Sequence, residues 1–180
     1  IARQRKDYEL GRVVLGRILE MHPETQWGSE ACLEYAILER DAGRESEALA
    51  LLERLSRDYP SSRQAGTALV MQGDVLLKEG RAKEAIQRFD NVLLVREWKG
   101  ELWPESLYKI GMAHRNLGNV REAFAYFQRV YVLYSFYAEW TAKSYLESAR
   151  CLEELGQKED AVKTLQEMLG SESLKETPEY

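Results

Sequence analysis

Two stretches of the sequence decide the fold: GDVLLKEGRAKEAIQRFDNV at residues 73–92 and GMAHRNLGNVREAFAYFQRV at residues 111–130. Each begins with a glycine and places a second glycine seven residues later. An acid, an alanine, a phenylalanine and a valine then follow at the same spacings in both. Self-similarity at a period of this length is typical of chains that stack one supersecondary unit repeatedly.

The same columns extend along the whole chain. The second glycine belongs to a series spaced 37 or 38 residues apart: Gly43, Gly80, Gly118 and Gly156. A small residue precedes each glycine by seven positions: Ala36, Gly73, Gly111 and Ala149. An acid and an alanine follow it at plus four and plus five: Glu47-Ala48, Glu84-Ala85, Glu122-Ala123 and Asp160-Ala161. Large apolar residues follow at plus nine and plus twelve: Leu52 and Leu55, Phe89 and Val92, Phe127 and Val130, Leu165 and Met168.

Each column has a physical meaning. A glycine that ends one helix adopts the left-handed cap conformation at little cost. An acid in the first turn of the next helix is stabilised by the helix dipole. The alanine and the small residue mark places where two helices approach closely, and the large residues fill the space between them. The sequence therefore predicts an all-α, right-handed superhelical solenoid of antiparallel helix pairs, with a period of 37–38 residues.

The predicted array occupies residues 1–170. It begins with a half repeat at 7–23, whose helix is expected over about 7–21, and continues with four pairs at 28–60, 62–97, 104–136 and 138–169. Within the pairs we expect helices at 28–42 and 45–58, 62–79 and 82–96, 104–117 and 120–134, and 138–155 and 158–169. Residues 171–180 are polar, and we expect this tail to fray. Because the chain begins with Ile1 and in mid-repeat, we expect it to be a piece of a longer array.

The glycine, small-residue, alanine and aromatic columns resemble the tetratricopeptide repeat, whose usual period is 34 residues. The junction Asp58-Tyr59-Pro60-Ser61-Ser62, followed by Ala65, Ala68-Leu69 and Gly73, is similar to one found in bacterial periplasmic members of that family. Those members include outer-membrane assembly lipoproteins and Tol–Pal-associated coordinators of cell division. The resemblance implies an adaptor in the bacterial envelope, periplasmic or associated with the outer membrane. A cytoplasmic location is the alternative.

Composition excludes several classes of protein. The 180 residues carry a net charge of −5, which does not indicate a nucleic-acid-binding surface. The sequence contains no run of 18 apolar residues, the length that a membrane-spanning helix needs. The only two cysteines, Cys32 and Cys151, lie in apolar helical patterns typical of buried thiols.

The residues with catalytic chemistry are sparse. The only histidines are His22 and His114, and neither has a histidine or cysteine at metal-ligand spacing. No phosphate-binding glycine motif is present. A cysteine–histidine pair assembled by the fold stays open. We predict a non-catalytic protein without cofactor or metal.

A peptide groove is the better functional hypothesis. The family resemblance places inward positions thirteen, ten, six and three residues before each glycine. These positions carry as many acids as bases, so no basic track for RNA is expected. The candidate protein-binding residues among them are Arg40, Asp74, Tyr108, Met112, Arg115, Lys143 and Arg150. Arg115, Lys143 and Arg150 could meet an acidic segment, because guanidinium groups bind carboxylates well; the alternative is that these cations pair with Glu105, Glu147 or Glu153 on the surface.

The aromatic residues divide by register. Trp27, Trp103 and Trp140 lie near whole-repeat spacings, which favours packing between repeats. Trp98 breaks that register in the longest junction, so the sequence predicts an interface contact there. On this interpretation Trp98→Ala would weaken a partner complex and leave thermal stability nearly unchanged. Tyr131 and Tyr134 are expected in the core, with interface use of the run Tyr131–Tyr137 as the alternative.

Three functions remain open from the sequence. The first is an adaptor whose concave face binds a peptide or protein segment. The second is a structural or self-assembling segment, possible as a homo-oligomer, because the first helix is expected to expose Val13, Val14, Ile18 and Leu19. The third is a regulatory repeat region of a larger enzyme.

Overall fold

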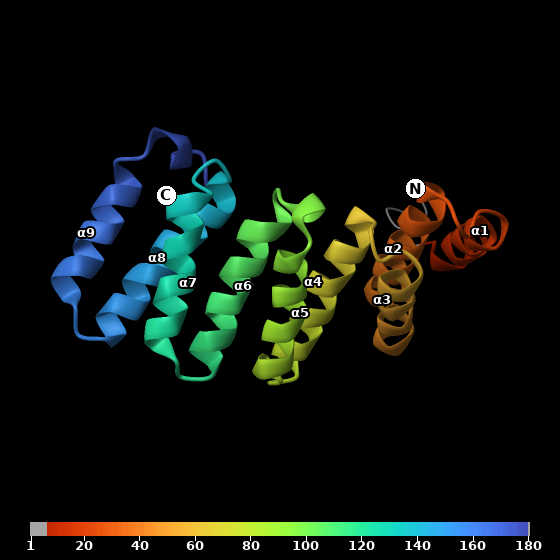
Figure 1. The fold of residues 1–180 in the computed structure, drawn as a ribbon, viewed down its shortest axis with the longest axis horizontal. Helices are drawn as coiled ribbons and strands as arrows, with labels where there is room; N and C mark the ends of the chain where they lie inside the picture. Colours follow the sequence, from red (N-terminus) through yellow and green to blue (C-terminus); the bar gives the residue numbers. More distant parts are fainter. Residues whose placement is uncertain (1–6, 180) are drawn as a thin grey trace. The chain divides into compact units, whose positions relative to one another are not determined.

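The computed structural model describes residues 7–179, and this part of the chain contains nine α-helices, two short 3-10 helices and no strands (Figure 1). Each α-helix begins and ends within two residues of its predicted bounds. The elements are α1 (Tyr8–Met21), α2 (Gln26–Asp41), α3 (Glu45–Asp58), α4 (Arg63–Lys78), α5 (Ala82–Leu94), η1 (Arg96–Trp98), α6 (Leu102–Asn116), α7 (Val120–Leu133), α8 (Ala138–Glu154), α9 (Lys158–Leu169) and η2 (Glu172–Leu174).

The chain divides into two compact units, one up to Gln72 and one from Gly73 onward, and the boundary falls inside α4. In the first unit α2 packs against both α1 and α3. In the second unit α5, α6, α7, α8 and α9 each pack against the next helix along the chain, and Figure 1 shows them side by side in that order. The predicted all-α solenoid of helix pairs is therefore confirmed.

The four periodic glycines end the first helix of each pair. Their φ angles lie between 75° and 78°, the left-handed region that suits glycine. In each case the amide of the following residue donates to a carbonyl five residues earlier, as Arg81 N does to Leu76 O at 2.8 Å. This pattern is the Schellman cap, and it satisfies carbonyl groups that the end of the helix would otherwise leave without a partner.

The small and large columns pack against each other with matched sizes. A Cβ atom added to Gly111 would lie 2.5 Å from the ring of Phe127, and one added to Gly73 would lie 2.3 Å from Phe89. Where the small residue is alanine, the large residue is leucine: Ala36 shares a core cluster with Leu52, and Ala149 packs with Leu165. The glycines are therefore required where a phenylalanine fills the space between the helices.

The junctions between pairs also repeat. Thr25 accepts a hydrogen bond from Gly28 N, and Ser62 accepts one from Ala65 N, so each caps the helix that follows. Both residues follow a proline by two positions and lie 37 residues apart. The Tyr59 hydroxyl donates to the carbonyl of Pro23 and ties the two junctions together. This repetition shows that α1 occupies the place of a second helix in a pair.

A buried ion cluster links the helices of the first unit. The Glu39 side chain is 1% exposed, and it accepts hydrogen bonds from Arg12 Nε at 2.8 Å and Arg44 Nε at 2.7 Å. Burial alone would raise the pKa of Glu39, but the hydrogen bonds from the two arginines outweigh it and hold the pKa below its usual value.

This cluster predicts a loss of stability in acid. A carboxyl group whose pKa is lower in the folded state stabilises the fold above its unfolded pKa, about 4.3, and this contribution disappears as pH falls through the folded pKa. We expect Glu39→Gln to lower the melting temperature at pH 7 and to shrink the further drop seen on acidification to about pH 3. Thermal unfolding followed by circular dichroism at several pH values measures both effects. Glu53→Gln, at an exposed position of α3, is the control and should behave like the wild type; an unchanged acid profile in Glu39→Gln would contradict the prediction.

Three expectations about apolar side chains were wrong. Trp98 is only 5% exposed, because η1 turns it inward after α5. Trp27, expected to pack between repeats, is 67% exposed. Leu19, expected on the surface of α1, is 4% exposed. The stacked rings of Tyr131 and Tyr145, with centroids 4.1 Å apart, fit the core interpretation of Tyr131.

The tail does not fray over the described residues. Glu172–Leu174 form η2, and the Leu174 side chain is completely buried. Leu174 packs with Ala142 of α8 and Met168 of α9. A single leucine in a polar segment is therefore enough to fix the tail on the last helix pair.

Candidate functional site

The predicted inward residues of the second unit lie on α4, α6 and α8, the first helices of their pairs. Asp74 on α4 accepts hydrogen bonds from Lys109 Nζ on α6 at 2.7 and 2.6 Å. Lys109 also lies 3.2 Å from Glu105 Oε1. Burial raises the pKa of Glu105, with the charge of Lys109 acting in the opposite direction. The sequence did not single out Lys109, because it lies one position beside the predicted inward column.

A second ion cluster joins α6 to α8. Glu147 is 5% exposed, and its carboxylate accepts hydrogen bonds from both Arg115 and Arg150. Arg115 also bonds to Glu154. The Arg150 side chain nevertheless remains 59% exposed. Both predicted arginines therefore pair with an acid, and the bond from Arg150 to Glu147 uses one of its nitrogens.

Three aromatic residues, Tyr108, Phe127 and Trp140, form a wall beside these ions. The Tyr108 ring lies 5.5 Å from the ring of Phe127 and 5.6 Å from that of Trp140. Burial, and next the charge of Glu147, raises the pKa of Tyr108 to about 12. Lys143 Nζ lies 4.8 Å above the Trp140 ring and pairs with Glu139. The wall thus presents a cation over an aromatic face, a contact that strengthens when water is excluded.

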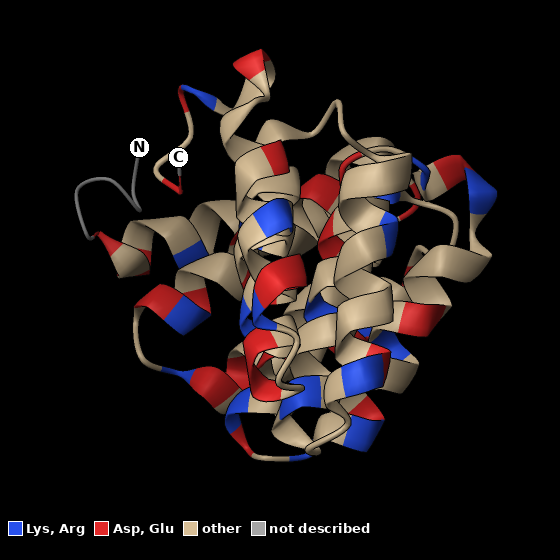
Figure 2. Cartoon of the chain, turned by 90° about the vertical axis from the view of Figure 1, so that its left-hand side faces the viewer, with Lys and Arg blue, Asp and Glu red and all other residues tan. Residues whose placement is uncertain are grey.

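The two remaining candidates differ: Met112 packs against the same core cluster as Tyr108, whereas Arg40 lies in the other unit. Met112 packs with Phe127 and Cys151, so it supports the wall from inside. Arg40 belongs to the first unit, is half exposed, and pairs with its neighbour Asp41. Figure 2 shows basic and acidic positions interspersed along the helices, which agrees with these short-range pairs.

The tail adds residues that the sequence interpretation left out of the site. A pocket of about 540 Å³ lies between the N-terminal turns of α8 and the segment after η2. Glu139 and Lys143 line it from the helix, and Glu176, Thr177, Pro178 and Glu179 line it from the tail. The N-terminal turns of α8 therefore already carry a segment of their own chain.

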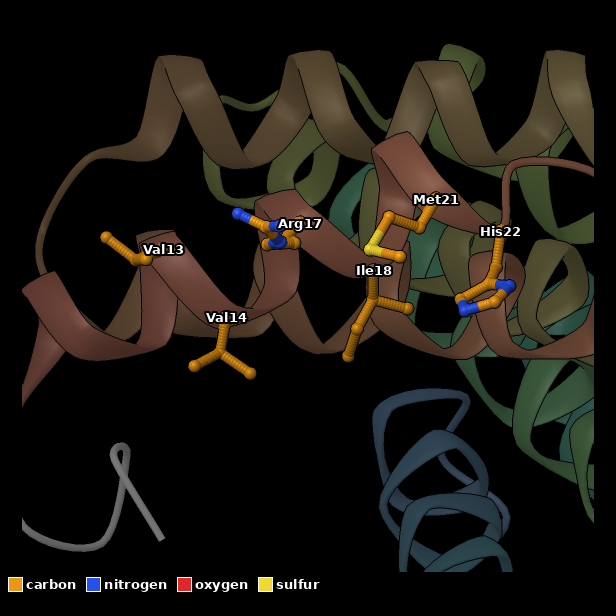
Figure 3. Close-up of a pocket in the computed structure, with 6 residues that line it drawn as sticks. All are labelled: Val13, Val14, Arg17, Ile18, Met21 and His22. Atoms are coloured by element: carbon orange, nitrogen blue, oxygen red, sulfur yellow. The ribbon is translucent and has the colours of Figure 1, made fainter.

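A separate apolar surface lies on α1. A shallow pocket of about 280 Å³ lies there. Figure 3 shows the residues that line it: Val13, Val14, Arg17, Ile18, Met21 and His22. Val13 and Val14 are 67% and 48% exposed, as predicted, and Ile18 is partly exposed. The self-assembly hypothesis rests on this surface.

The described residues contain no group of three or more histidines, cysteines or acids that could hold a metal ion. Burial raises the pKa of Cys32 and of Cys151 to about 11, which disfavours the reactive thiolate. His114 stacks on Tyr126, whereas Cys151 packs with Ala123 and Phe127. None of the helices between residues 7 and 179 is long and apolar enough to cross a membrane.

The chain is a helical repeat protein of the solenoid class. Its helix pairs stack, glycines cap the first helix of each pair, and these first helices line the inward face. The chain belongs to the tetratricopeptide repeat family: two family models described as tetratricopeptide repeat match residues 33–101 and 104–170. Proteins of this family are generally non-catalytic scaffolds for protein interactions.

Solved structures agree on the fold. The chain is similar to a crystal structure of MamA, with 16% identity, a TM-score of 0.74, and coverage of 99% of this chain and 95% of that one. It is also similar to the repeats of a putative kinesin light chain from Podosopora anserina, with 18% identity, a TM-score of 0.70, and coverage of 92% and 87%. A third similar structure is pilF of Pseudomonas aeruginosa, with 18% identity, a TM-score of 0.70, and coverage of 92% and 69%. No curated protein sequence gives a significant match.

Proposed function

We propose that this chain is a non-catalytic adaptor that binds an acidic peptide or protein segment on the inner face of α6 and α8. The observation that carries the proposal is the state of Arg150. Its guanidinium is held by the buried Glu147, yet its side chain is 59% exposed. A guanidinium has five N–H donors in a planar fork, and the bond to Glu147 uses a single one of its nitrogens.

The neighbouring groups complete a site for such a segment. Lys143 adds a second cation, and Trp140 and Tyr108 add apolar surface beside it. Because Glu147 fixes Arg150 and Arg115 before any ligand arrives, little side-chain entropy is lost on binding. The acids on this face balance the bases, so the site favours a short acidic segment over a long polyanion such as a nucleic acid.

A peptide display experiment tests this function. We expect a random library panned on the full chain to enrich acidic peptides, and the Arg150→Glu variant to bind them about 10- to 100-fold more weakly, the size of one charge-assisted hydrogen bond. Lys163→Glu makes the same charge change at an exposed position on α9 and serves as the control, which should bind like the wild type. Peptides that bind both variants equally, or a library without enrichment, would refute the proposed site.

The location of this adaptor is proposed from one junction. The Asp58–Ser62 pattern resembles that of periplasmic members of the family and supports a place in the bacterial envelope. Fractionation of the source cell tests the location; recovery of the protein with the cytoplasmic fraction would contradict it.

A further inference from the structure

The segment from Leu174 to Glu179 lies on the face that the proposed function assigns to a partner. We propose that this segment is an internal competitor: it occupies the inner face of α8, and an acidic partner segment binds by displacing it. The inference rests on the proposed function and adds to it both the chemistry of the ligand and a means of regulation.

Leu174 anchors the segment through its apolar side chain. Leu174 is completely buried among Ala142, Met168 and the partly buried Ala138, Tyr145 and Leu146. The local hydrogen bonds around it, such as Thr177 N to Leu174 O at 2.9 Å, shape the segment itself. The Leu174 side chain therefore provides the main apolar contact that holds the segment on α8.

The segment also carries a net negative charge. Residues 171–179 contain three glutamates and one lysine, so the segment is acidic. Glu176 and Glu179 line the same pocket as Lys143. Glu179 also acts electrostatically on Tyr108, the residue that Glu147, Arg150 and Arg115 influence as well. The acidic end of the segment therefore approaches the part of the site proposed for the partner.

The fit of the segment on α8 is incomplete. One carboxylate oxygen of Glu179 is buried without a hydrogen-bond partner among the described residues. A buried polar atom left unpaired costs free energy, so it weakens the seating of the segment. A partner that places a carboxylate where Arg150 or Lys143 can donate to it would gain the hydrogen bond that Glu179 lacks. The favoured ligand is thus a segment with a large apolar residue followed within about five residues by acids, the spacing of Leu174 to Glu179.

A substitution that removes the Leu174 anchor tests the inference. The Leu174→Asp variant of the full chain and a fluorescent peptide with the sequence of residues 171–179 are mixed, and binding is followed by anisotropy. We expect the peptide to bind Leu174→Asp at least tenfold more tightly than the wild type, where the chain's own segment competes. Val162→Asp places the same charge at an exposed site of α9 and should match the wild type.

Equal affinity of the peptide for Leu174→Asp and the wild type, or no binding to a Leu174→Asp protein that melts cooperatively, would overturn the inference. If Leu174→Asp does not fold, amide hydrogen exchange on the wild type replaces it. Exchange at residues 174–179 should accelerate at least tenfold when a display-selected acidic peptide binds, and unchanged exchange would overturn the inference. If peptide binding depends on Arg150 but is unchanged by Leu174→Asp, only the competitor role of the segment is refuted. If peptide binding is enhanced by Leu174→Asp but unaffected by Arg150→Glu, only the proposed Arg150 site is refuted.

Discussion

Trp98→Ala is expected to lower the free energy of unfolding by about 3–5 kcal/mol, the cost of removing a large aromatic side chain from a core. Trp98 is 5% exposed and lies in the η1 turn that follows α5. Its removal leaves a cavity that the surrounding helices cannot fully close. Chemical denaturation followed by circular dichroism measures the change.

Trp27→Ala is the matched control for this prediction. Trp27 lies at the start of α2 and is 67% exposed, so the same substitution should change the unfolding free energy by less than about 0.5 kcal/mol. Similar losses in the two variants would contradict the burial of Trp98. A small effect of Trp98→Ala would restore the interface interpretation that the sequence suggested.

Gly111→Ala is expected to destabilise the second unit by about 1–3 kcal/mol, although alanine is the better helix former. The new Cβ would lie 2.5 Å from the Phe127 ring, which is completely buried and cannot move away freely. Combining it with Phe127→Leu recreates the Ala–Leu pairing that the chain uses in its first and last pairs, at Ala36 with Leu52 and Ala149 with Leu165. The double variant should therefore be more stable than the sum of the single changes predicts.

A control separates this contact from the helix propensity of alanine. Gly16 lies within α1, and a Cβ added there meets nothing within 4 Å. Gly16→Ala should stabilise the chain by about 0.5–1 kcal/mol. Additive effects of Gly111→Ala and Phe127→Leu in a denaturation cycle would show that the two residues do not compete for the same space.

The helices and their core were predictable because the same residue pattern recurs in every repeat. The glycine caps, the small residues and the large residues each recur in all four pairs, so chance agreement in one pair is corrected by the others. The junction at Thr25 and Ser62 follows the same rule, and the structure shows that both residues cap a helix in the same way.

Two errors, at Trp98 and in the tail, arose where a residue occurs once, whereas Trp27 follows the repeat spacing and is nevertheless 67% exposed. Trp98 lies in the longest junction, and no other repeat shows how that junction folds. Leu174 is the one leucine, isoleucine, valine or methionine among the last ten residues, so periodicity could not place it. Lys109 became visible only with the structure, and the sequence named Glu147 only as an alternative surface partner of the cations, because ion pairs between first helices depend on the distance between neighbouring repeats. For the same reason, the sequence left open whether the cations of the inner face are free or paired with acids.

The most direct test of the central claim is a nuclear magnetic resonance titration of the labelled full chain with a display-selected acidic peptide. The largest shift changes are expected on inner-face residues of α6 and α8, including Tyr108, Lys143 and Arg150, together with Leu174 as the tail is displaced. Changes confined to the outer helices α7 and α9, with α6 and α8 unaffected, would contradict the claim.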